Sequence, residues 1–165
     1  MFAPPLSTKV CAHCSGRLSR TAAWCPTCQK STLPHIAGKL ASPGKRLAAY
    51  LFDILAPSFG TGAISRLLLG AGPGHGKLTT AILLAWAVWS MFLFANGMTP
   101  GKWLVNIYVI DEAGDPAGFF RMLVREWIGK PISMMVFCLG YVWILIDQDN
   151  QGWHDKLVDT YVVED

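Results

Sequence analysis

The chain has 165 residues, enough for one main body and a small appendage, because domains average roughly 100 to 200 residues. Hydrophobic residues make up 52% of the chain and charged residues 15%, against roughly 25% charged residues in ordinary globular chains. This composition excludes an ordinary water-soluble domain and indicates that lipid surrounds much of the chain, whose net charge is +3.

The positive charge is concentrated near the N-terminus. Residues 1–46 carry seven of the 14 Lys and Arg residues and contain no Asp or Glu. A basic flank directly before a hydrophobic segment is typical of the side of a membrane protein that stays in the cytoplasm. The position therefore favours a topological role over nucleic-acid binding, and it predicts a cytoplasmic N-terminus.

Two Cys-x-x-Cys pairs form the strongest local signal. Ten residues separate the pair Cys11 and Cys14 from the pair Cys25 and Cys28. Each pair places two thiolates in one tight turn, so together they supply the four corners of a tetrahedron with Zn–S distances of about 2.3 Å. Because four thiolates leave no open position, the pattern predicts a structural Zn²⁺ site that folds a ribbon over residues 1–30. Disulfides and a thioredoxin-type redox pair are the alternatives, which a cytoplasmic location and the lack of a strand-helix-strand pattern disfavour.

The next segments predict a linker and a helical hairpin. Residues 31–44 lack apolar periodicity and are rich in Pro, Gly and Ser, which predicts a flexible linker to a membrane body over residues 45–163. The first candidate span covers residues 47–69, with a kink expected near Pro57. Residues 78–95 follow a glycine-rich turn and form eighteen residues without a charge, the clearest transmembrane helix.

Two β-like segments flank a third helical region. Residues 104–110, which follow a turn cluster over residues 97–102, and residues 159–163 are rich in β-branched and aromatic residues, and such isolated strands gain by pairing with each other. Between them, residues 119–130 predict an amphipathic helix, and the apolar residues 131–146 give about 24 Å of helix against about 30 Å of hydrocarbon. This region is either a third span or a re-entrant hairpin broken at Pro131, and the second alternative is favoured because only it lets the strands meet.

The predicted fold class is therefore a mainly α-helical integral membrane protein with a small N-terminal zinc ribbon. It has two spans, a third span or re-entrant helix, and a small β pairing on the cytoplasmic face.

Charged residues are predicted within the membrane body. Arg46, Tyr50 and Asp53 recur at i, i+4 and i+7, so they share one face of the first helix, and Asp53 lies about 10 Å deeper than Arg46. A carboxylate at that depth is costly. Asp53 is therefore either functional or paired with Arg125 or Lys130 to lock the helices together.

A second polar group, residues 147–156, precedes the C-terminal strand. Within it, the adjacent His154 and Asp155 have the chemistry to relay a proton or bind a cation. A solvated turn is the simpler interpretation of Asp147 and Asp149.

At this point the chain resembles the RDD family of membrane proteins, which is named for one arginine and two aspartates. The resemblance covers about residues 44–163 and rests on motifs in the expected order: Arg46-x-x-Ala-Tyr-x-x-Asp53, Thr99-Pro-Gly-Lys102, Val109-Ile-Asp111, Gly114, Arg125, Gln151-Gly-Trp-His-Asp155 and Thr160-Tyr-Val-Val163. It implies that the named residues are Arg46, Asp53 and Asp155. It also implies an expectation of transport, since sodium/proton exchange has been suggested for some members.

Two functions follow as hypotheses for a multi-pass protein of the bacterial inner membrane. The first is cation/proton transport by a homo-oligomer, with Asp53 as the titrating carboxylate and Arg46 tuning it. The second is a membrane-anchored scaffold whose cytosolic zinc ribbon docks a protein partner. An enzyme is not expected, because the chain shows no nucleophile motif, open metal site or cofactor fingerprint.

Overall fold

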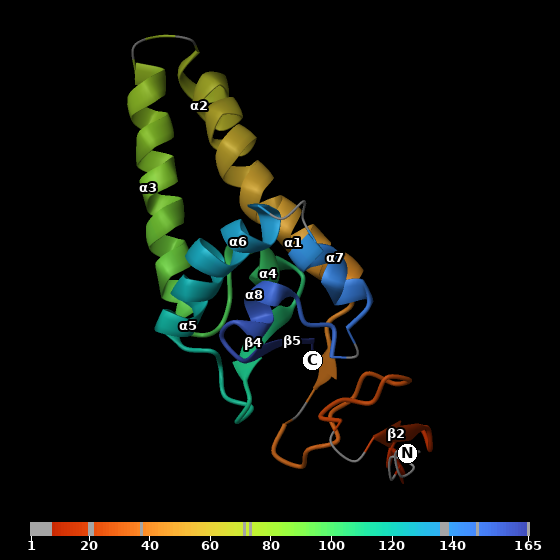
Figure 1. Ribbon diagram of the computed structural model, residues 1–165. Helices are drawn as coiled ribbons and strands as arrows, with labels where there is room; N and C mark the ends of the chain where they lie inside the picture. The colour runs from red at the N-terminus through yellow and green to blue at the C-terminus, as the bar shows by residue number, and fades with distance from the viewer. Residues whose placement is uncertain are drawn as a thin grey trace.

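The computed structural model describes residues 8–19, 22–36, 38–70, 72, 74–135, 139–147 and 149–164. Two long apolar helices form an antiparallel hairpin that projects from a body of short helices and strands (Figure 1). The first consists of α1 (Pro43–Leu55), a π-helical turn (Ala56–Gly60) and α2 (Thr61–Leu69), and the second is α3 (Gly74–Phe94). With 27 and 21 residues, both are long and apolar enough to cross a membrane, as predicted.

The predicted kink near Pro57 takes the form of the π-helical turn. Pro57 has no N–H to donate, and a π-helical turn is a common way for a helix to absorb such a local break. Thr61 donates its hydroxyl to the carbonyl oxygen of Pro57 at 2.8 Å, which satisfies an acceptor that the turn frees. The first span therefore continues through the proline without ending there.

A three-stranded antiparallel sheet lies at the open end of the hairpin. Its strand order is β3 (Lys39–Leu40), β5 (Thr160–Glu164) and β4 (Ile107–Asp111). The predicted pairing of the two β-like segments is thus present, with Val109 opposite Val162. β4 begins three residues later than expected, because Pro100–Leu104 form the short helix α4 in place of a turn.

The third strand comes from the predicted linker. Residues 31–44 were expected to lack regular structure, yet Lys39–Leu40 pair with β5 and Pro43 already begins α1. Two residues are too few to show the alternation of a strand, so β3 is recognised only by its pairing with β5. The segment therefore ties the N-terminal ribbon to the sheet.

The ribbon itself begins with a small hairpin. β1 (Thr8–Val10) pairs antiparallel with β2 (Arg17–Ser19), and the first cysteine pair lies in the turn between them.

The third helical region is bent. It comprises α5 (Phe119–Val124), a π-helical turn (Arg125–Gly129) and α6 (Lys130–Met135), followed by α7 (Leu139–Val142) and a 3₁₀ turn (Trp143–Leu145). The two halves meet at an angle of 106°. A Cβ on Gly140 would lie 2.5 Å from the Cβ of Ser133, so only glycine lets α7 fold against α6.

The location of this bend differs from the prediction. The break lies between Met135 and Leu139, whereas Pro131 sits inside α6, directly after the π-helical turn. β4 precedes the bent region and β5 follows it, and the two strands pair. A third crossing would place them on opposite faces of a membrane, so the pairing favours the re-entrant alternative.

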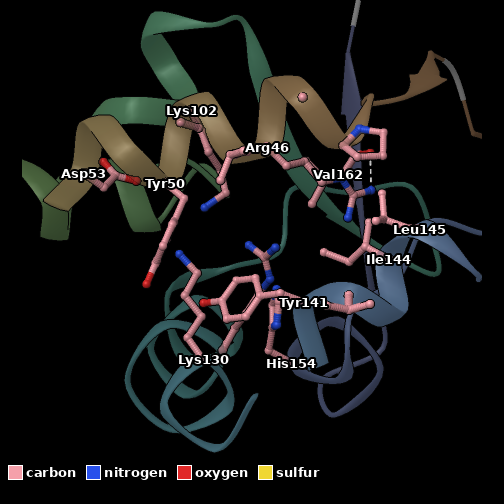
Figure 2. Close-up of a pocket in the computed structure, with 16 residues that line it drawn as sticks. Arg46, Tyr50, Asp53, Lys102, Lys130, Tyr141, Ile144, Leu145, His154 and Val162 are labelled. Atoms are coloured by element: carbon pink, nitrogen blue, oxygen red, sulfur yellow. Dashed lines mark hydrogen bonds between the residues drawn. The ribbon is translucent and has the colours of Figure 1, made fainter. Parts of the chain in front are cut away.

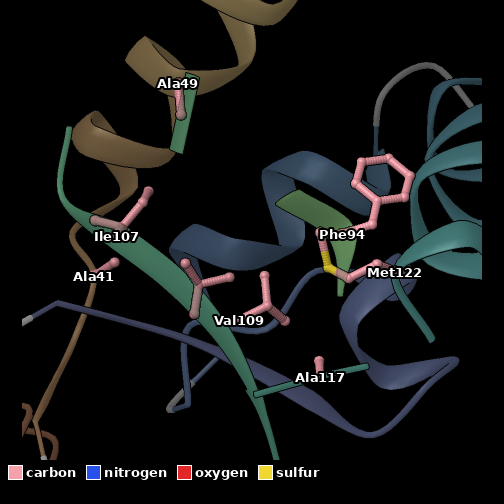
Figure 3. Close-up of a cluster of buried hydrophobic side chains, with 8 residues drawn as sticks. Ala41, Ala49, Phe94, Ile107, Val109, Ala117 and Met122 are labelled. Carbon is pink, nitrogen blue, oxygen red and sulfur yellow. The ribbon is translucent and has the colours of Figure 1, made fainter. Parts of the chain in front are cut away.

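Apolar residues fill both faces of the sheet. On one face, the strands pack against α1, α3 and α5 in a cluster of fully or nearly fully buried side chains (Figure 3): Ala41, Ala49, Phe94, Ile107, Val109, Ala117, Met122 and Val162. The opposite face packs against the ribbon through Trp24, Ile36, Leu40, Ile110 and Val163. This two-sided burial explains why the strands read as apolar runs without alternation. α8 (Trp153–Lys156) completes the body.

Candidate functional site: a charged cavity beside the first helix

Arg46, Arg125 and Asp155 meet in a buried cluster. Arg46 on α1 donates from Nη1 to Oδ2 of Asp155 at 3.1 Å, and Arg125 donates from Nε to Oδ1 at 2.6 Å. The Asp155 side chain is 0% exposed, and its Oδ2 also accepts from the backbone N–H of Gly152. Two cations and one carboxylate thus join α1, the π-helical turn Arg125–Gly129 and α8 at one point.

Arg46 also connects α1 to the strands. Its Nε donates to the carbonyl oxygen of Ala41 at 3.3 Å, and its Nη2 donates to that of Val162 at 3.2 Å. Each of its three nitrogen donors therefore has a partner. Burial of a guanidinium in this way requires such complete pairing.

A second ionic cluster adjoins the first. Glu126 accepts from Nζ of Lys102 at 2.8 Å and forms a further ion pair with Lys130 in the next helical turn. Arg125 lies 3.4 Å from the same carboxylate and so connects the two clusters. Burial lowers the pKa of Lys102 to about 8, although the negative charge of Glu126 opposes that shift.

Asp53 is held by hydrogen bonds. The hydroxyl of Thr99 donates to Oδ2 at 2.6 Å, and the N–H of Gly101 donates to Oδ1 at 2.7 Å. A Cβ on Gly101 would lie 2.1 Å from the carbonyl oxygen of Ala49, so glycine is needed for α4 to approach α1 this closely. Among the described residues, no Lys, Arg or His nitrogen forms an ion pair with Asp53.

Asp53 and the four cations of these clusters line a cavity of about 410 Å³ between α1 and the bent region. Figure 2 shows Arg46, Tyr50 and Asp53 along one side of α1, facing Lys130, Tyr141 and His154 on the opposite wall. The shared face predicted for Arg46, Tyr50 and Asp53 is thus present. Nζ of Lys130 lies 5.2 Å from the ring centroid of Tyr50, within the range of a cation–π contact.

His154 forms the floor of the cavity. Its Nδ1 lies 3.2 Å from the hydroxyl of Ser133, and its ring packs 4.9 Å from that of Tyr141. Burial lowers the pKa of His154 to about 4, so the imidazole is neutral at physiological pH. Burial by itself would raise the pKa of Asp155, but Arg125, His154 and Arg46 hold it well below its usual range.

The four cysteines form a separate site. Their sulfur atoms all lie within 4.8 Å of one another, with Cys11 and Cys28 3.8 Å apart and Cys14 and Cys25 3.6 Å apart. A tetrahedron with Zn–S bonds of about 2.3 Å has edges of about 3.8 Å. The donor set therefore fits a metal ion with four thiolate ligands.

The ribbon is packed against the body. The Leu40 N–H donates to the carbonyl oxygen of Gln29 at 2.9 Å, and Asn150 donates to the Gln29 side chain at 2.6 Å. The rings of Trp24 and Tyr161 lie 5.6 Å apart. The metal site thus lies on a unit that contacts the sheet.

The structure brings most of the predicted site residues together in a new pairing. Arg46, Arg125 and His154 line the cavity, and Asp155 lies behind them in ion pairs with both arginines. The predicted partners of Asp53 bind other carboxylates: Arg125 binds Asp155, and Lys130 binds Glu126.

Three participants were not predicted: Lys102, Thr99 and Glu126. The motif Thr99-Pro-Gly-Lys102 marked the first two without a role, and the i,i+4 spacing of Glu126 and Lys130 was available as a signal. In the polar turn before α8, Asp147 pairs with the partly exposed Lys156 at 2.6 Å and accepts a hydrogen bond from the N–H of Gln151 at 3.0 Å. Its side chain is only 11% exposed, so this turn is less solvated than expected.

The chain was compared with known proteins. A family model described as the RDD family matches residues 40–159, more than half of the chain. No curated protein and no solved structure matches it. The matched range contains the residues that line the cavity except Val162, and the cysteine cluster lies before it.

Proposed function

The chain belongs to the RDD family, and from this premise and its charged cavity we propose that it takes part in cation/proton transport across the bacterial inner membrane. Its candidate spans show it to be a membrane-type protein. In this proposal the basic flank keeps the N-terminus in the cytoplasm, and the four cysteines bind a structural Zn²⁺ there. No enzymatic step is part of the proposal.

Asp53 is the observation that carries the proposal. It is the only acidic side chain among the described residues that line the cavity, and it has hydrogen-bond donors but no ion-pair partner there. An ionisable side chain in a membrane helix is by default a functional-site hypothesis, and a carboxylate without a fixed counter-ion has the chemistry to bind a proton or a metal cation. Thr99 and Gly101 orient it without neutralising it.

Two spans and a re-entrant region are too few to enclose a pathway. We therefore propose that the transporting unit is a homo-oligomer. The hairpin supports this proposal, because its two helices leave many large apolar side chains exposed, such as Phe59 in the π-helical turn Ala56–Gly60, Leu67 in α2 and Phe92 in α3. These faces are suited to contact lipid and other copies of the chain.

The test is cation-driven proton flux in proteoliposomes. Wild-type protein is expected to dissipate a pH gradient when sodium is added, and Asp53→Asn is expected to abolish that flux. Asp111→Asn is the matched control, since Asp111 pairs with the half-exposed Arg121 at the end of β4. Absence of flux in the wild type, or unchanged flux in Asp53→Asn, would refute the proposal.

The scaffold function remains a second candidate because part of the ribbon surface is free. Val10 is 66% exposed, and the adjacent Ala12 and His13 are exposed as well. We propose that this surface docks a cytosolic protein partner. An unchanged set of co-purified proteins after Cys11→Ser and Cys14→Ser would exclude that role.

A further inference from the structure

The charges around the cavity do not cancel. The lining side chains include Arg46, Lys102, Arg125 and Lys130, and Asp53 is their only carboxylate among the described residues. Glu126 and Asp155 lie directly behind this lining and pair with its cations. Four positive and three negative charges leave an excess of one positive charge, because His154 is neutral.

An uncompensated positive charge in a low-dielectric site is costly, so a bound anion would stabilise it. The cations come from α1, α4, the π-helical turn and α6, and Figure 2 shows Lys102 and Lys130 pointing into the same space from opposite walls. The two tyrosines, Tyr50 and Tyr141, add hydroxyl groups to the lining. A phosphodiester carries one negative charge, which balances the excess, and its oxygens match such donors.

The mouth of the cavity is apolar and open. Leu47, Val142 and Leu145 belong to the lining, and they are 57%, 46% and 70% exposed. Leu47 belongs to α1, part of a candidate span, and Val142 and Leu145 belong to α7 and the 3₁₀ turn that follows it. Exposed aliphatic side chains at such a position are suited to contact with the hydrocarbon of a bilayer. A ligand that enters here meets aliphatic side chains first and the charged groups behind them.

We propose that the cavity binds the phosphate headgroup of an anionic phospholipid from the surrounding bilayer. The volume of about 410 Å³ lies in the range of small-ligand pockets and accommodates a headgroup, while the acyl chains stay outside along Leu47 and Leu145. A free phosphate ion would satisfy the charges but would leave this apolar mouth unused. The shape of the site therefore selects a lipid.

This inference goes beyond the transport proposal and bears on it. The uncompensated positive charge opposes the entry of a second cation towards Asp53. A bound phosphodiester removes the excess charge and so favours a proton or cation at Asp53. Lipid binding is measured without flux, so either proposal can fail alone.

Native mass spectrometry of the purified full chain tests the proposal. The chain is titrated with phosphatidylglycerol, with phosphatidylcholine, which has no net charge, and with inorganic phosphate. Phosphatidylglycerol is expected to bind at least about tenfold more tightly than phosphatidylcholine, which corresponds to about 1.4 kcal/mol. Inorganic phosphate is expected not to displace it.

Two variants locate the site. Lys130→Gln removes the excess charge and is expected to weaken phosphatidylglycerol binding about tenfold. Lys156→Gln, an exposed lysine on α8 with the same change of charge, is expected to bind like the wild type. Leu145→Gln alters only an exposed position at the mouth, so it tests the lipid contact even if Lys130→Gln does not fold.

Several results would overturn the proposal. Equal binding of the two lipids would show that charge does not select the ligand. Equal losses in Lys130→Gln and Lys156→Gln would indicate a general attraction of anions. Displacement by inorganic phosphate would identify a soluble phosphate compound as the ligand. Full phosphatidylglycerol binding by Leu145→Gln would show that the apolar mouth does not hold the acyl chains.

Discussion

Replacement of Asp155 by Asn is expected to destabilise the protein strongly. Asn has nearly the same shape as Asp, but it removes the carboxylate that Arg46 and Arg125 share. Both arginine side chains are nearly fully buried, with exposed fractions of 9% and 3%. Breaking a buried ion pair by removing one partner costs about 3 to 5 kcal/mol, because an uncompensated charge stays behind.

A thermal melt of detergent-purified protein measures this effect. At roughly 2 to 4 °C per kcal/mol, the loss corresponds to a fall in Tm of roughly 6 to 20 °C. Asp149→Asn is the matched control in the same polar segment: burial and Asp147 raise the pKa of Asp149, so its neutralisation is expected to cost nothing. If both variants melt within about 2 °C of each other, the cluster does not hold α1, α8 and the bent region together.

Two further predictions concern pH and metal. Burial lowers the pKa of His154 to about 4 in the folded chain, below its ordinary 6.5, so the unfolded chain binds this proton more readily and stability falls as the pH drops. The wild type is expected to lose about 2 kcal/mol of stability between pH 7 and pH 5. In His154→Gln, the Tm should stay flat in that window. Chelation of the metal, or Cys25→Ser, is expected to unfold the ribbon and to release the Leu40 amide from Gln29, so hydrogen exchange should accelerate in β3 but not in α3. Unchanged protection of β3 in the metal-free protein would show that the ribbon does not depend on the ion.

Local sequence signals predicted the helical hairpin and the cysteine cluster. A run of eighteen uncharged residues predicts a transmembrane helix without reference to the rest of the chain, because a helix in lipid forms all its backbone hydrogen bonds within itself. The spacing Cys-x-x-Cys likewise encodes its turn within four residues. Both features need no knowledge of distant parts of the chain.

The sequence did not predict the position of the bend in the third helical region or the strand β3. Pro131 is a strong local signal for a break, but the preceding π-helical turn allows it to continue within α6. The bend follows instead from the close approach of Gly140 to Ser133, which depends on how α7 folds back. β3 was missed for a similar reason, since two residues become a strand only where β5 offers an edge.

The sequence by itself determined that this is a membrane protein of the RDD family with cysteines suited to a metal, and that Arg46, Tyr50 and Asp53 share a helix face. The tertiary structure alone decided which charges meet. Asp155, which binds Arg46, lies 109 residues from it in the sequence. Asp53 accepts hydrogen bonds from Thr99 and Gly101, while the cations predicted to pair with it bind other carboxylates. The physical reason is that a buried charge pairs with whichever group the packing brings within hydrogen-bond distance. Helix packing depends on the side chains of both helices, so the residue spacing within one helix does not predict it.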